Sequence, residues 1–424
     1  MSQRQNSLIK HSKLKIQNYL LKILLVHNFY GSSAPSGENT AFQAESGLLR
    51  KNGHTVIEFT RNSDEVRNLG SFGLLKGAFS TPWNPFSLKA LKNILIKEKP
   101  DILHVHNFFP LISPSIFYAT NDLDTPTVFT LHNYRIVCAN AILLRNNSPC
   151  TECLDKQSIL PSLKYKCYRE SRMATLPLAL SIKLHQVLGT WQRKVDAFIS
   201  LTEFQKNKLI EAGLPAEKIH IKPHFYSSPP NPLPFNERGS KVVFIGRLGP
   251  EKGINVLLHA WKMWGEDAPD LEIIGDGPKR HPLEKYSATN NLDNKISFLG
   301  QLPFPQTLDK LSRARLSILP TLCYEGFPMT VLEAFAMGVP VVASNIGSLP
   351  CIIENNKNGA LFKAGDSEAL CNALKEVWGN RENLEQMSTA ARSTFEESFS
   401  TEINHKILMD IYQEASKRKK FTQQ

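Results

Sequence analysis

The 424-residue sequence has no long hydrophobic run, no recognisable export signal and few cysteines. No apolar stretch reaches the roughly 18 residues that a membrane-spanning helix requires. Residues 1–21 form a polar, basic N-terminal extension without the apolar segment and small-residue cleavage site of a secretory signal, so we expect a cytoplasmic protein. Seven cysteines is an odd number, and a cytoplasmic location disfavours a disulfide framework.

Two motifs that bind phosphate or metal in other enzymes are incomplete or misplaced. The loop Gly31–Asn39 follows the first predicted strand, but it lacks the Gly-Lys-Ser/Thr ending of a P-loop and alone is a weak phosphate signal. The Asp-Leu-Asp sequence at 122–124 matches an Asp-x-Asp metal motif, yet it lies at the amino end of a predicted strand, and we interpret it as a turn. No basic motif interleaved with aromatic residues appears, so we expect no nucleic-acid partner.

The length and the repeating pattern predict two α/β domains. A chain of this size suggests two domains of about 200 residues each. Both halves alternate short β-branched runs with longer helical patterns, which is typical of parallel sheets flanked by helices. The predicted strands are 22–30, 55–60, 101–106, 127–132, 197–202 and 219–225 in the first half, and 242–248, 271–275, 296–300, 316–321 and 339–344 in the second.

We therefore predict two Rossmann-like, doubly wound parallel-sheet domains that face a central cleft. Four prolines between residues 229 and 234 mark the linker between them, because such a dense run continues neither a strand nor a helix. The predicted parts are the extension 1–21, a first domain 22–226 with a cysteine-containing insertion at about 134–172, a Pro-rich linker 227–239, a second domain 240–400, and a C-terminal helix and tail 401–424 that packs back on the first domain.

The most informative segment is PTLCYEGFPMTVLEAFAMGVPVVAS, residues 320–344. It follows a predicted strand, turns at 325–328 and then has a helical pattern. Pro328 suits the first turn of a helix, and such a turn presents free backbone N–H groups and a positive helix end to an anion. Glu325 and Glu333 are eight residues apart, so both can line one side of the cleft. A solvated helix face is the alternative, which the apolar neighbours of Glu333 disfavour.

A loop with two cations follows the first strand of the second half. In FIGRLGPEKG (244–253) the strand ends at Gly246, and Arg247 and Lys252 follow. Cations at the carboxyl end of a strand suit a diphosphate, which Arg binds as a fork and Lys as a point charge. An exposed basic loop is the alternative.

Histidines end two predicted strands of the first half. His104 and His106 end the third strand, and His132 ends the fourth. A lone histidine is more often structural than functional, but ligands of doubly wound sheets bind beyond the carboxyl ends of the strands, so the position of His132 favours a functional role.

Four cysteines cluster in the insertion. A Cys-x-x-Cys pair with two outlying cysteines can form a zinc site, although the outer spacings are not those of a standard finger, and free or redox-active thiols remain the alternative. The candidate structural zinc ligands are Cys138, Cys150, Cys153 and Cys167.

Taken together, these segments resemble the family-4 glycosyltransferases from about residue 22 to residue 415. The most specific part is the Glu-x7-Glu element at 325–333; supporting parts are GRLGPEKG, IGDGP, FLGQLP and NGALFKAGD. The insertion, with LHNYRIVCAN and PCTEC, is similar to a subgroup involved in bacterial surface polysaccharides. The resemblance implies the GT-B fold and a retaining enzyme that moves a sugar from a nucleotide-diphosphate donor to a glycan or lipid-linked acceptor in cell-surface polysaccharide biosynthesis.

The resemblance also implies a role for each charged residue. Arg247 and Lys252 would bind the donor diphosphate and stabilise the charge on the leaving phosphate. Glu325 would hold the hydroxyls of the donor sugar, and Glu333 would accept from the ribose diol. His132 would lie near the anomeric centre and the 6-hydroxyl of the sugar.

Backbone positions complete the implied donor site. The N–H groups of Gly326 and Phe327 would assist in holding the sugar, and Gly37 would let the backbone approach a substrate. Gly246, at the end of its strand, belongs to the same donor-binding set. The family needs no metal or other cofactor for catalysis. One departure from its pattern is the His-Phe pair at 224–225, where Asn-Gly is common.

The positive charge of the chain is concentrated in its first half. Residues 1–222 hold 28 Lys and Arg against 16 Asp and Glu, whereas residues 223–424 hold 22 against 23. This asymmetry predicts an anionic partner such as a membrane surface or lipid-linked phosphate, with a solvated basic face as the alternative. The helical stretch 173–191 would contact either lipid or the core. The protein is thus expected in the cytoplasm, either free or at the inner face of the plasma membrane.

Two other functions fit the same sequence. A GT-B sugar-nucleotide epimerase would use the same donor without an acceptor, and a non-catalytic nucleotide-sugar-binding protein would use it without reaction. The physical chemistry favours transfer, because fixed cations aimed at a departing diphosphate stabilise the charge that develops there. A retaining glycosidase would instead need two carboxylates about 5 Å apart and no cations for a diphosphate.

Overall fold

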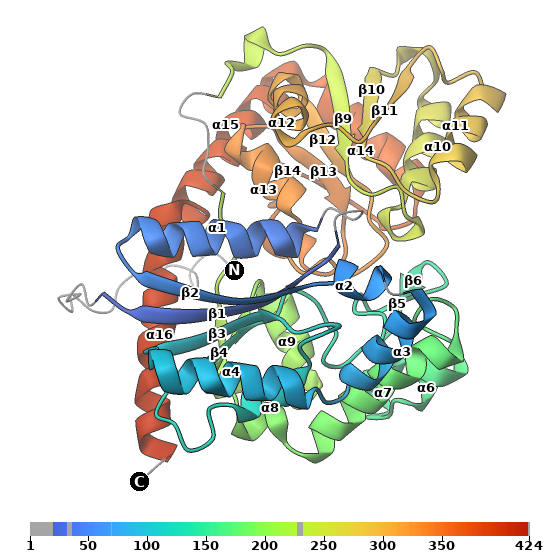
Figure 1. Ribbon diagram of the computed structural model, residues 1–424. Helices are drawn as coiled ribbons and strands as arrows, with labels where there is room; N and C mark the ends of the chain where they lie inside the picture. The colour runs from blue at the N-terminus through green and yellow to red at the C-terminus, as the bar shows by residue number, and fades with distance from the viewer. Residues whose placement is uncertain (1–19, 32–35, 69, 227–231, 423–424) are drawn as a thin grey trace.

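The computed structural model describes residues 20–31, 36–68, 70–226 and 232–422. Most of the predicted N-terminal extension, part of the Gly31–Asn39 loop and residues 227–231 of the predicted linker lie outside the described residues. Figure 1 shows two α/β domains, with the first domain below and the second above. Each domain is built on a six-stranded parallel sheet, which confirms the predicted fold class.

The sheet of the first domain has the strand order β2-β1-β3-β4-β7-β8. Its order reverses between β1 and β3, and in doubly wound sheets ligands bind beyond the carboxyl ends of the strands at such a point. The strands are β1 (Lys22–Phe29), β2 (Thr55–Asn62), β3 (Ile102–Asn107), β4 (Thr127–Thr130), β7 (Ala197–Ser200) and β8 (Ile219–Ile221). The helices around this sheet are α1 (Gly37–Lys51), α2 (Asp64–Arg67), α3 (Gly70–Ser80), α4 (Pro85–Glu98) and α9 (Glu203–Glu211).

The central strands of this sheet are buried on both faces, as their continuous apolar sequences require. In β1, Leu24 and Val26 pack toward α4, while Ile23 and Leu25 pack toward α1. The insertion after β4 adds a small hairpin and a group of helices. Its elements are β5 (Leu144–Arg145), β6 (Ser148–Pro149), α5 (Glu152–Asp155) and α6 (Leu160–Lys164), and α7 (Arg172–Val187) and α8 (Thr190–Arg193) follow it.

The sheet of the second domain has the strand order β11-β10-β9-β12-β13-β14, which reverses between β9 and β12. Its strands are β9 (Lys241–Ile245), β10 (Asp270–Ile274), β11 (Ile296–Gly300), β12 (Leu316–Leu319), β13 (Val341–Ser344) and β14 (Gly359–Phe362). Its helices are α10 (Ile254–Trp264), α11 (Arg280–Thr289), α12 (Phe304–Arg313), α13 (Met329–Ala336), α14 (Ser367–Gly379) and α15 (Arg381–Ser398).

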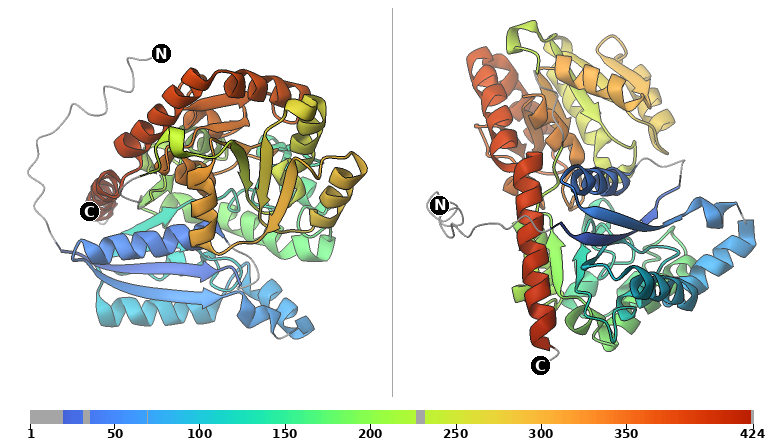
Figure 2. Two further views of the ribbon diagram at one scale, coloured as in Figure 1. Left: turned by 90° about the horizontal axis from the view of Figure 1, so that it is seen from above. Right: turned by 60° about the vertical axis from the view of Figure 1, so that its left-hand side comes forward.

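The long helix α16 (Thr401–Thr422) leaves the second domain and runs along the first, as the right-hand view of Figure 2 shows. Its residues Leu408, Ile411 and Tyr412 are buried in the same hydrophobic cluster as Ile23 and Leu25 of β1. The C-terminal helix therefore contributes to the core of the first domain. No helix within the described ranges has both the length and the apolar character needed to cross a membrane.

Candidate functional site

The loops that the sequence analysis singled out in the two halves meet at the domain interface. A side chain added at Gly326, in the turn after β12, would lie 2.6 Å from the backbone oxygen of His132, which follows β4. A side chain added at Gly37, at the start of α1, would lie 3.4 Å from Met329 Cγ, at the start of α13. The structure thus brings the carboxyl ends of strands from both sheets to one region.

Lys252 and Glu325 form a largely buried ion pair in this region. The Nζ atom of Lys252 donates to Oε1 of Glu325 at 2.7 Å, and the Thr321 hydroxyl donates to the same oxygen at 3.0 Å. Burial alone would raise the pKa of the Glu325 carboxyl, but the Lys252 ammonium and these hydrogen bonds hold that pKa below its ordinary value. Burial likewise opposes the charge of Lys252, yet Glu325 raises the pKa of its ammonium. Both groups are therefore charged at neutral pH.

The loop that carries Arg247 and Lys252 is docked on the turn after β12. The backbone oxygen of Glu251 accepts from the N–H of Leu322 at 2.8 Å, and a side chain at Gly253, where φ is 67°, would lie 1.9 Å from the oxygen of Pro320. Only glycine fits this approach. The guanidinium of Arg247 lies 2.6 Å from Oε1 of Glu251, and its side chain is 63% exposed. Lys252 is thus fixed by Glu325, while Arg247 remains accessible to a ligand.

Helix α13 begins one residue later than the sequence predicts. Pro328 is its N-cap residue, in an extended conformation, rather than a member of its first turn. The physical reason is that the turn from β12 is still extended at Pro328, so the first helical residue is Met329. The glutamate predicted to bind ribose, Glu333, lies inside this helix and is only 7% exposed. Burial raises the pKa of its carboxyl from 4.5 to about 7.

The remaining predicted backbone positions lie close to these loops. Gly246 directly follows β9, and its N–H donates to the backbone oxygen of Ile274 at 3.0 Å. Phe327 is buried, and its ring packs edge-on against the rings of His224 and Phe399 at centroid distances of 5.9 and 5.4 Å. The turn at Phe327 is therefore held by aromatic contacts with the first domain and the end of α15.

His132 is a buried, neutral imidazole in a cluster of histidines. Its Nε2 atom lies 3.1 Å from Nδ1 of His106, and its ring stacks on that of His224 with centroids 5.2 Å apart. Burial, together with His224, His106 and His27, lowers the pKa of His132 well below its ordinary value of 6.5. Its Nδ1 atom has no hydrogen-bond partner in the described part of the chain. A neutral imidazole in this state can exchange a hydrogen bond with a ligand hydroxyl but supplies no charge.

The sequence analysis missed Glu45 and Lys222, which are buried behind His132. Glu45 lies in α1 and Lys222 follows β8, and Lys222 Nζ donates to Glu45 Oε2 at 2.7 Å. A signal for Glu45 was available, because it lies four residues after Ala41 and three before Leu48, on the apolar stripe of the helix. A carboxylate on a buried stripe needs a partner.

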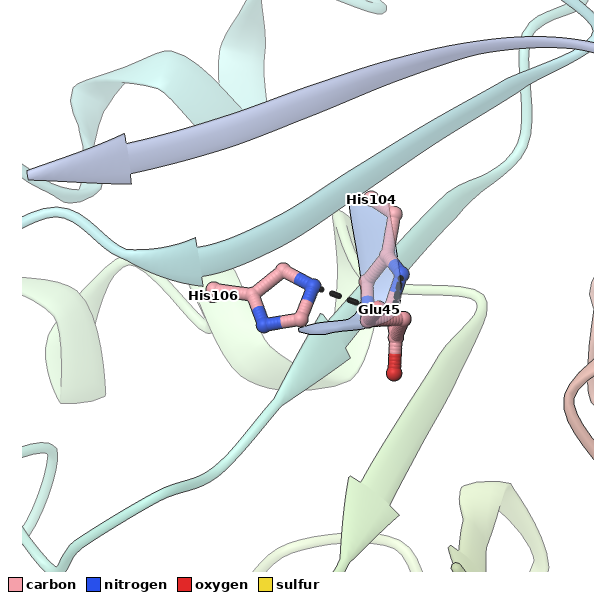
Figure 3. A group of neighbouring side chains, drawn as sticks. All are labelled: Glu45, His104 and His106. Carbon is pink, nitrogen blue, oxygen red and sulfur yellow. Dashed lines mark ion pairs between the residues drawn. The ribbon is translucent and has the colours of Figure 1, made fainter. Parts of the chain in front are cut away.

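Glu45, His104 and His106 form the one group of three close metal-ligating side chains found among the described residues, shown in Figure 3. Oε1 of Glu45 lies 3.1 Å from His104 Nδ1 and 3.1 Å from His106 Nε2. The Lys222 ammonium already neutralises the carboxylate, so a divalent ion at this position would bury an uncompensated positive charge. We therefore assign the role of the cation to Lys222.

The four cysteines of the insertion are not assembled as a ligand set. All four are free thiols, and within the described ranges no three of their sulfurs lie within 4.8 Å of one another. Burial and the neighbouring thiols raise the pKa of Cys153 to about 12 and that of Cys167 to about 11. Zinc binding by these residues remains a prediction from the sequence.

The Asp-x-Asp sequence at 122–124 lies in the turn before β4, at the opposite end of that strand from His132. Asp122 has a φ of 64° and lies 4.0 Å from the ammonium of Lys92, with 88% of its side chain exposed. These aspartates are therefore remote from the loops described above.

Both halves of the chain match known families. Residues 38–227 match Glycosyltransferase Family 4, and residues 229–394 match Glycosyl transferases group 1. The amylovoran biosynthesis glycosyltransferase AmsK of Erwinia amylovora is 27% identical over 230 residues, which cover 51% of this chain and 56% of AmsK. Phosphatidyl-myo-inositol mannosyltransferase of Mycobacterium leprae is 31% identical over 212 residues, which cover 49% of this chain and 56% of that protein. The chain spans just over half the length of these two curated relatives.

Solved structures match over nearly the whole chain. Anabaena Alr3699/HepE, solved in complex with UDP, is 18% identical, with a TM-score of 0.62 and coverage of 92% of this chain and 99% of that one. At this level of identity the likeness concerns the fold, which is the GT-B arrangement of two Rossmann-like domains.

Proposed function

The chain belongs to the glycosyltransferases, with a Family 4 domain followed by a group 1 domain in the GT-B fold, and on this premise we propose that it transfers a sugar from a nucleotide-diphosphate donor to an acceptor hydroxyl with retention of anomeric configuration. The observation that carries the proposal is the Lys252–Glu325 pair, which holds a cation and a carboxylate next to each other at the domain interface. A cation binds the diphosphate of such a donor, and a carboxylate accepts hydrogen bonds from the hydroxyls of its sugar.

In the proposed reaction, the cations act on the departing diphosphate. Transfer leaves negative charge on the diphosphate, and Lys252 and Arg247 stabilise that charge as the sugar–phosphate bond breaks. The N-terminus of α13 faces the same region through Gly326 and Phe327, and its free N–H groups add to the positive potential. This chemistry needs no metal, since fixed cations already neutralise the leaving group.

Glu325 and His132 act on the sugar. Glu325 is held as a carboxylate by Lys252, so it accepts hydrogen bonds from sugar hydroxyls and opposes the positive charge that develops on the ring. His132 is neutral, so it shares a hydrogen bond with a sugar hydroxyl but supplies no charge. Glu333 binds the ribose diol, which does not change during transfer.

The relatives support the proposed substrates. AmsK is named for amylovoran biosynthesis and the Mycobacterium leprae protein for mannosyl transfer to phosphatidyl-myo-inositol, which favours a glycan or lipid-linked acceptor in cell-surface polysaccharide or glycolipid synthesis. The UDP bound to Alr3699/HepE supports a nucleotide-sugar donor.

We also propose that the first domain binds an anionic membrane surface. Helix α7 buries Leu178 and Ile182 but leaves Met173, Leu180 and Val187 exposed at 80%, 48% and 72%. Exposed apolar side chains on one helix of a basic domain suit the interface of an anionic bilayer. This location fits an enzyme whose acceptor is attached to lipid.

Donor binding and product analysis test the proposal together. A thermal-shift screen with UDP, GDP, ADP and their sugars should raise the unfolding temperature for one nucleotide class, because a ligand of the native state stabilises it. NMR of the product should then show a new glycosidic bond with the anomeric configuration of the donor. An isomerised nucleotide-sugar formed without acceptor would indicate an epimerase, and binding without any product would indicate a non-catalytic protein. An inverted product would contradict the retaining mechanism.

A further inference from the structure

Behind His132 lies a buried group of polar side chains that the proposed reaction does not use. Glu45 approaches from α1, His106 from β3 and Lys222 from the segment after β8 (Figure 3 labels the first two with His104). Each is buried, and the space between them is too small to hold a water molecule. The protons of this buried group are therefore positioned by contacts among its side chains and not by a bridging water molecule.

Lys222 determines the charge of Glu45, the first member of this buried group. Its ammonium lies 2.7 Å from Oε2 of Glu45 and 3.1 Å from Oδ1 of Asn404, a residue of α16. Burial alone would raise the pKa of Glu45, but Lys222 and the two neighbouring histidines hold it well below its ordinary value. Glu45 is therefore a carboxylate, which can only accept hydrogen bonds.

The carboxylate determines which nitrogen of His106 carries its proton. Oε1 of Glu45 lies 3.1 Å from Nε2 of His106, and neither atom has a hydrogen-bond partner in the described ranges. A lone pair on Nε2 would be repelled by the facing carboxylate oxygen, whereas an N–H is attracted to it. Nε2 is therefore the protonated nitrogen, and with a single proton on the ring Nδ1 is left with a lone pair.

The same logic extends one residue further, to His132. Nδ1 of His106 lies 3.1 Å from Nε2 of His132, and two lone pairs cannot face each other at that distance. Nε2 of His132 must then be the donor. Since His132 is neutral, its Nδ1 atom carries no proton and can only accept a hydrogen bond. This is the same buried atom that has no hydrogen-bond partner among the described residues.

We propose that Glu45 is a positioning residue, which acts through His106 to hold His132 in the tautomer with Nε2 protonated and Nδ1 free to accept a hydrogen bond from a hydroxyl of the donor sugar. A carboxylate that fixes the tautomer of the imidazole it contacts is an established device in enzymes, and its loss lowers turnover by leaving the wrong nitrogen protonated. Here the effect passes through His106 to the next imidazole. The identity of the hydroxyl rests on the proposed function, whereas the tautomer does not.

The C-terminal helix α16, which packs into the core of the first domain, supports this arrangement. Asn404 of α16 accepts from Lys222 and donates to the backbone oxygen of Pro223 at 2.6 Å. Asn404 of α16 therefore holds the Lys222 ammonium beside Glu45.

Nitrogen NMR of the full chain, labelled with ¹⁵N-histidine, tests the inference directly at neutral pH. Two-bond nitrogen–proton spectra report which ring nitrogen is protonated, and the signals of His132 are those missing from a His132→Gln variant. In the wild type, Nε2 should be protonated and Nδ1 bare. Glu45→Gln, which keeps the size but removes the charge, should mix the two tautomers. It should also lower kcat by about 10- to 100-fold with a donor KM within about twofold, as for other residues that orient a functional histidine.

Tyr412→Phe is the matched control, because it removes a hydrogen bond to His104 without touching the path from Glu45 to His132. It should leave the tautomer of His132 unchanged and kcat within about twofold of wild type. A wild-type His132 protonated on Nδ1 would overturn the inference, even if Glu45→Gln failed to fold. So would a folded Glu45→Gln variant with unchanged tautomer and kcat. If the wild type has the expected tautomer but transfers no sugar, the positioning role stands and the proposed function fails.

Discussion

The ammonium of Lys252 and the carboxylate of Glu325 lie 2.7 Å apart, although 73 residues separate them in the sequence. Lys252 follows β9 and Glu325 follows β12, the two strands on either side of the switch point of the second sheet. The topology of the sheet therefore brings together a group proposed to bind phosphate and a group proposed to bind sugar. A change to either residue should affect the other.

Lys252→Ala and Arg247→Ala should each lower kcat/KM by roughly 30- to 1000-fold, or about 2–4 kcal/mol of transition-state stabilisation, as for loss of one preorganised group. Lys252→Ala should have the larger effect, because it also leaves Glu325 without its ion-pair partner. Steady-state kinetics with the identified donor measure both. Lys262→Ala on the exposed face of α10 is the control and should be silent. A silent Arg247→Ala would show that its assigned role is wrong.

Gly326→Ala should lower turnover, because its new methyl group would lie 2.6 Å from the backbone oxygen of His132 and force the two loops apart. A displacement of about 1 Å at reacting groups can cost roughly 100-fold in rate. Gly47→Ala is the matched control, since that helical position has no neighbour within 4 Å. It should stabilise the protein by about 1 kcal/mol without changing kcat. Equal kinetics for the two variants would contradict the close approach at Gly326.

Much of the fold is predictable from the sequence because parallel strands buried on both faces have continuous apolar runs. All eleven predicted strands are present, with ends that coincide or differ by at most four residues. Strand β14 (Gly359–Phe362) was missed as a strand, because its sequence Gly-Ala-Leu-Phe contains none of the β-branched residues that mark the predicted strands. The hairpin of β5 and β6, with two residues in each strand, gives no periodic signal at all.

The candidate site is only partly predictable for a different reason. Arg247, Lys252, Glu325 and His132 lie in loops that begin at the carboxyl ends of strands, so the positions of the strand ends indicate where they lie. Glu45 is in the middle of a helix, and its link to His132 runs through His106 and depends on a contact with Lys222, 177 residues away. Tertiary packing determines these contacts between distant residues, so their spacing along the sequence does not predict them.

The cysteine insertion should hold one zinc ion per chain if the sequence pattern is correct. Metal binding would have to draw the sulfurs together and remove protons from thiols whose pKa values burial has raised, so it should be weakened as the pH falls. Elemental analysis of protein washed with a weak chelator measures the content. Less than about a tenth of an equivalent, with all four thiols titratable in the native protein, would exclude a structural zinc site.

The protein should sediment with anionic vesicles and not with neutral ones, and the binding should weaken as salt is added. Leu180→Glu combined with Val187→Glu removes exposed apolar side chains of α7 and should abolish it. Met263→Glu, at an exposed position of α10 in the second domain, is the matched control and should bind like the wild type. Negligible binding of the wild type to both kinds of vesicle would end the membrane proposal.

Glu333 should make both stability and donor binding depend on pH. Burial raises the pKa of its carboxyl from 4.5 to about 7 in the folded protein, so the folded state favours the protonated form. Its stabilising contribution is present below pH 4.5 and is lost as the pH rises through about 7. Glu333→Gln, which cannot ionise, should therefore be as stable as wild type at pH 4 and more stable by about 3 kcal/mol at pH 8, using roughly 1.4 kcal/mol per pKa unit. Thermal unfolding at the two pH values measures the difference.

Donor binding should have the opposite dependence on pH. If the Glu333 carboxylate accepts from the ribose diol, ionised Glu333 binds the donor better, and the wild-type donor KM should rise as the pH falls through about 7. The KM of Glu333→Gln should be higher than that of the wild type at pH 8 and independent of pH across this range, with kcat nearly intact because the ribose is unchanged in the transition state. Loss of turnover in Glu333→Gln with unchanged donor KM would instead assign Glu333 to the reacting sugar, and the ribose role would be wrong.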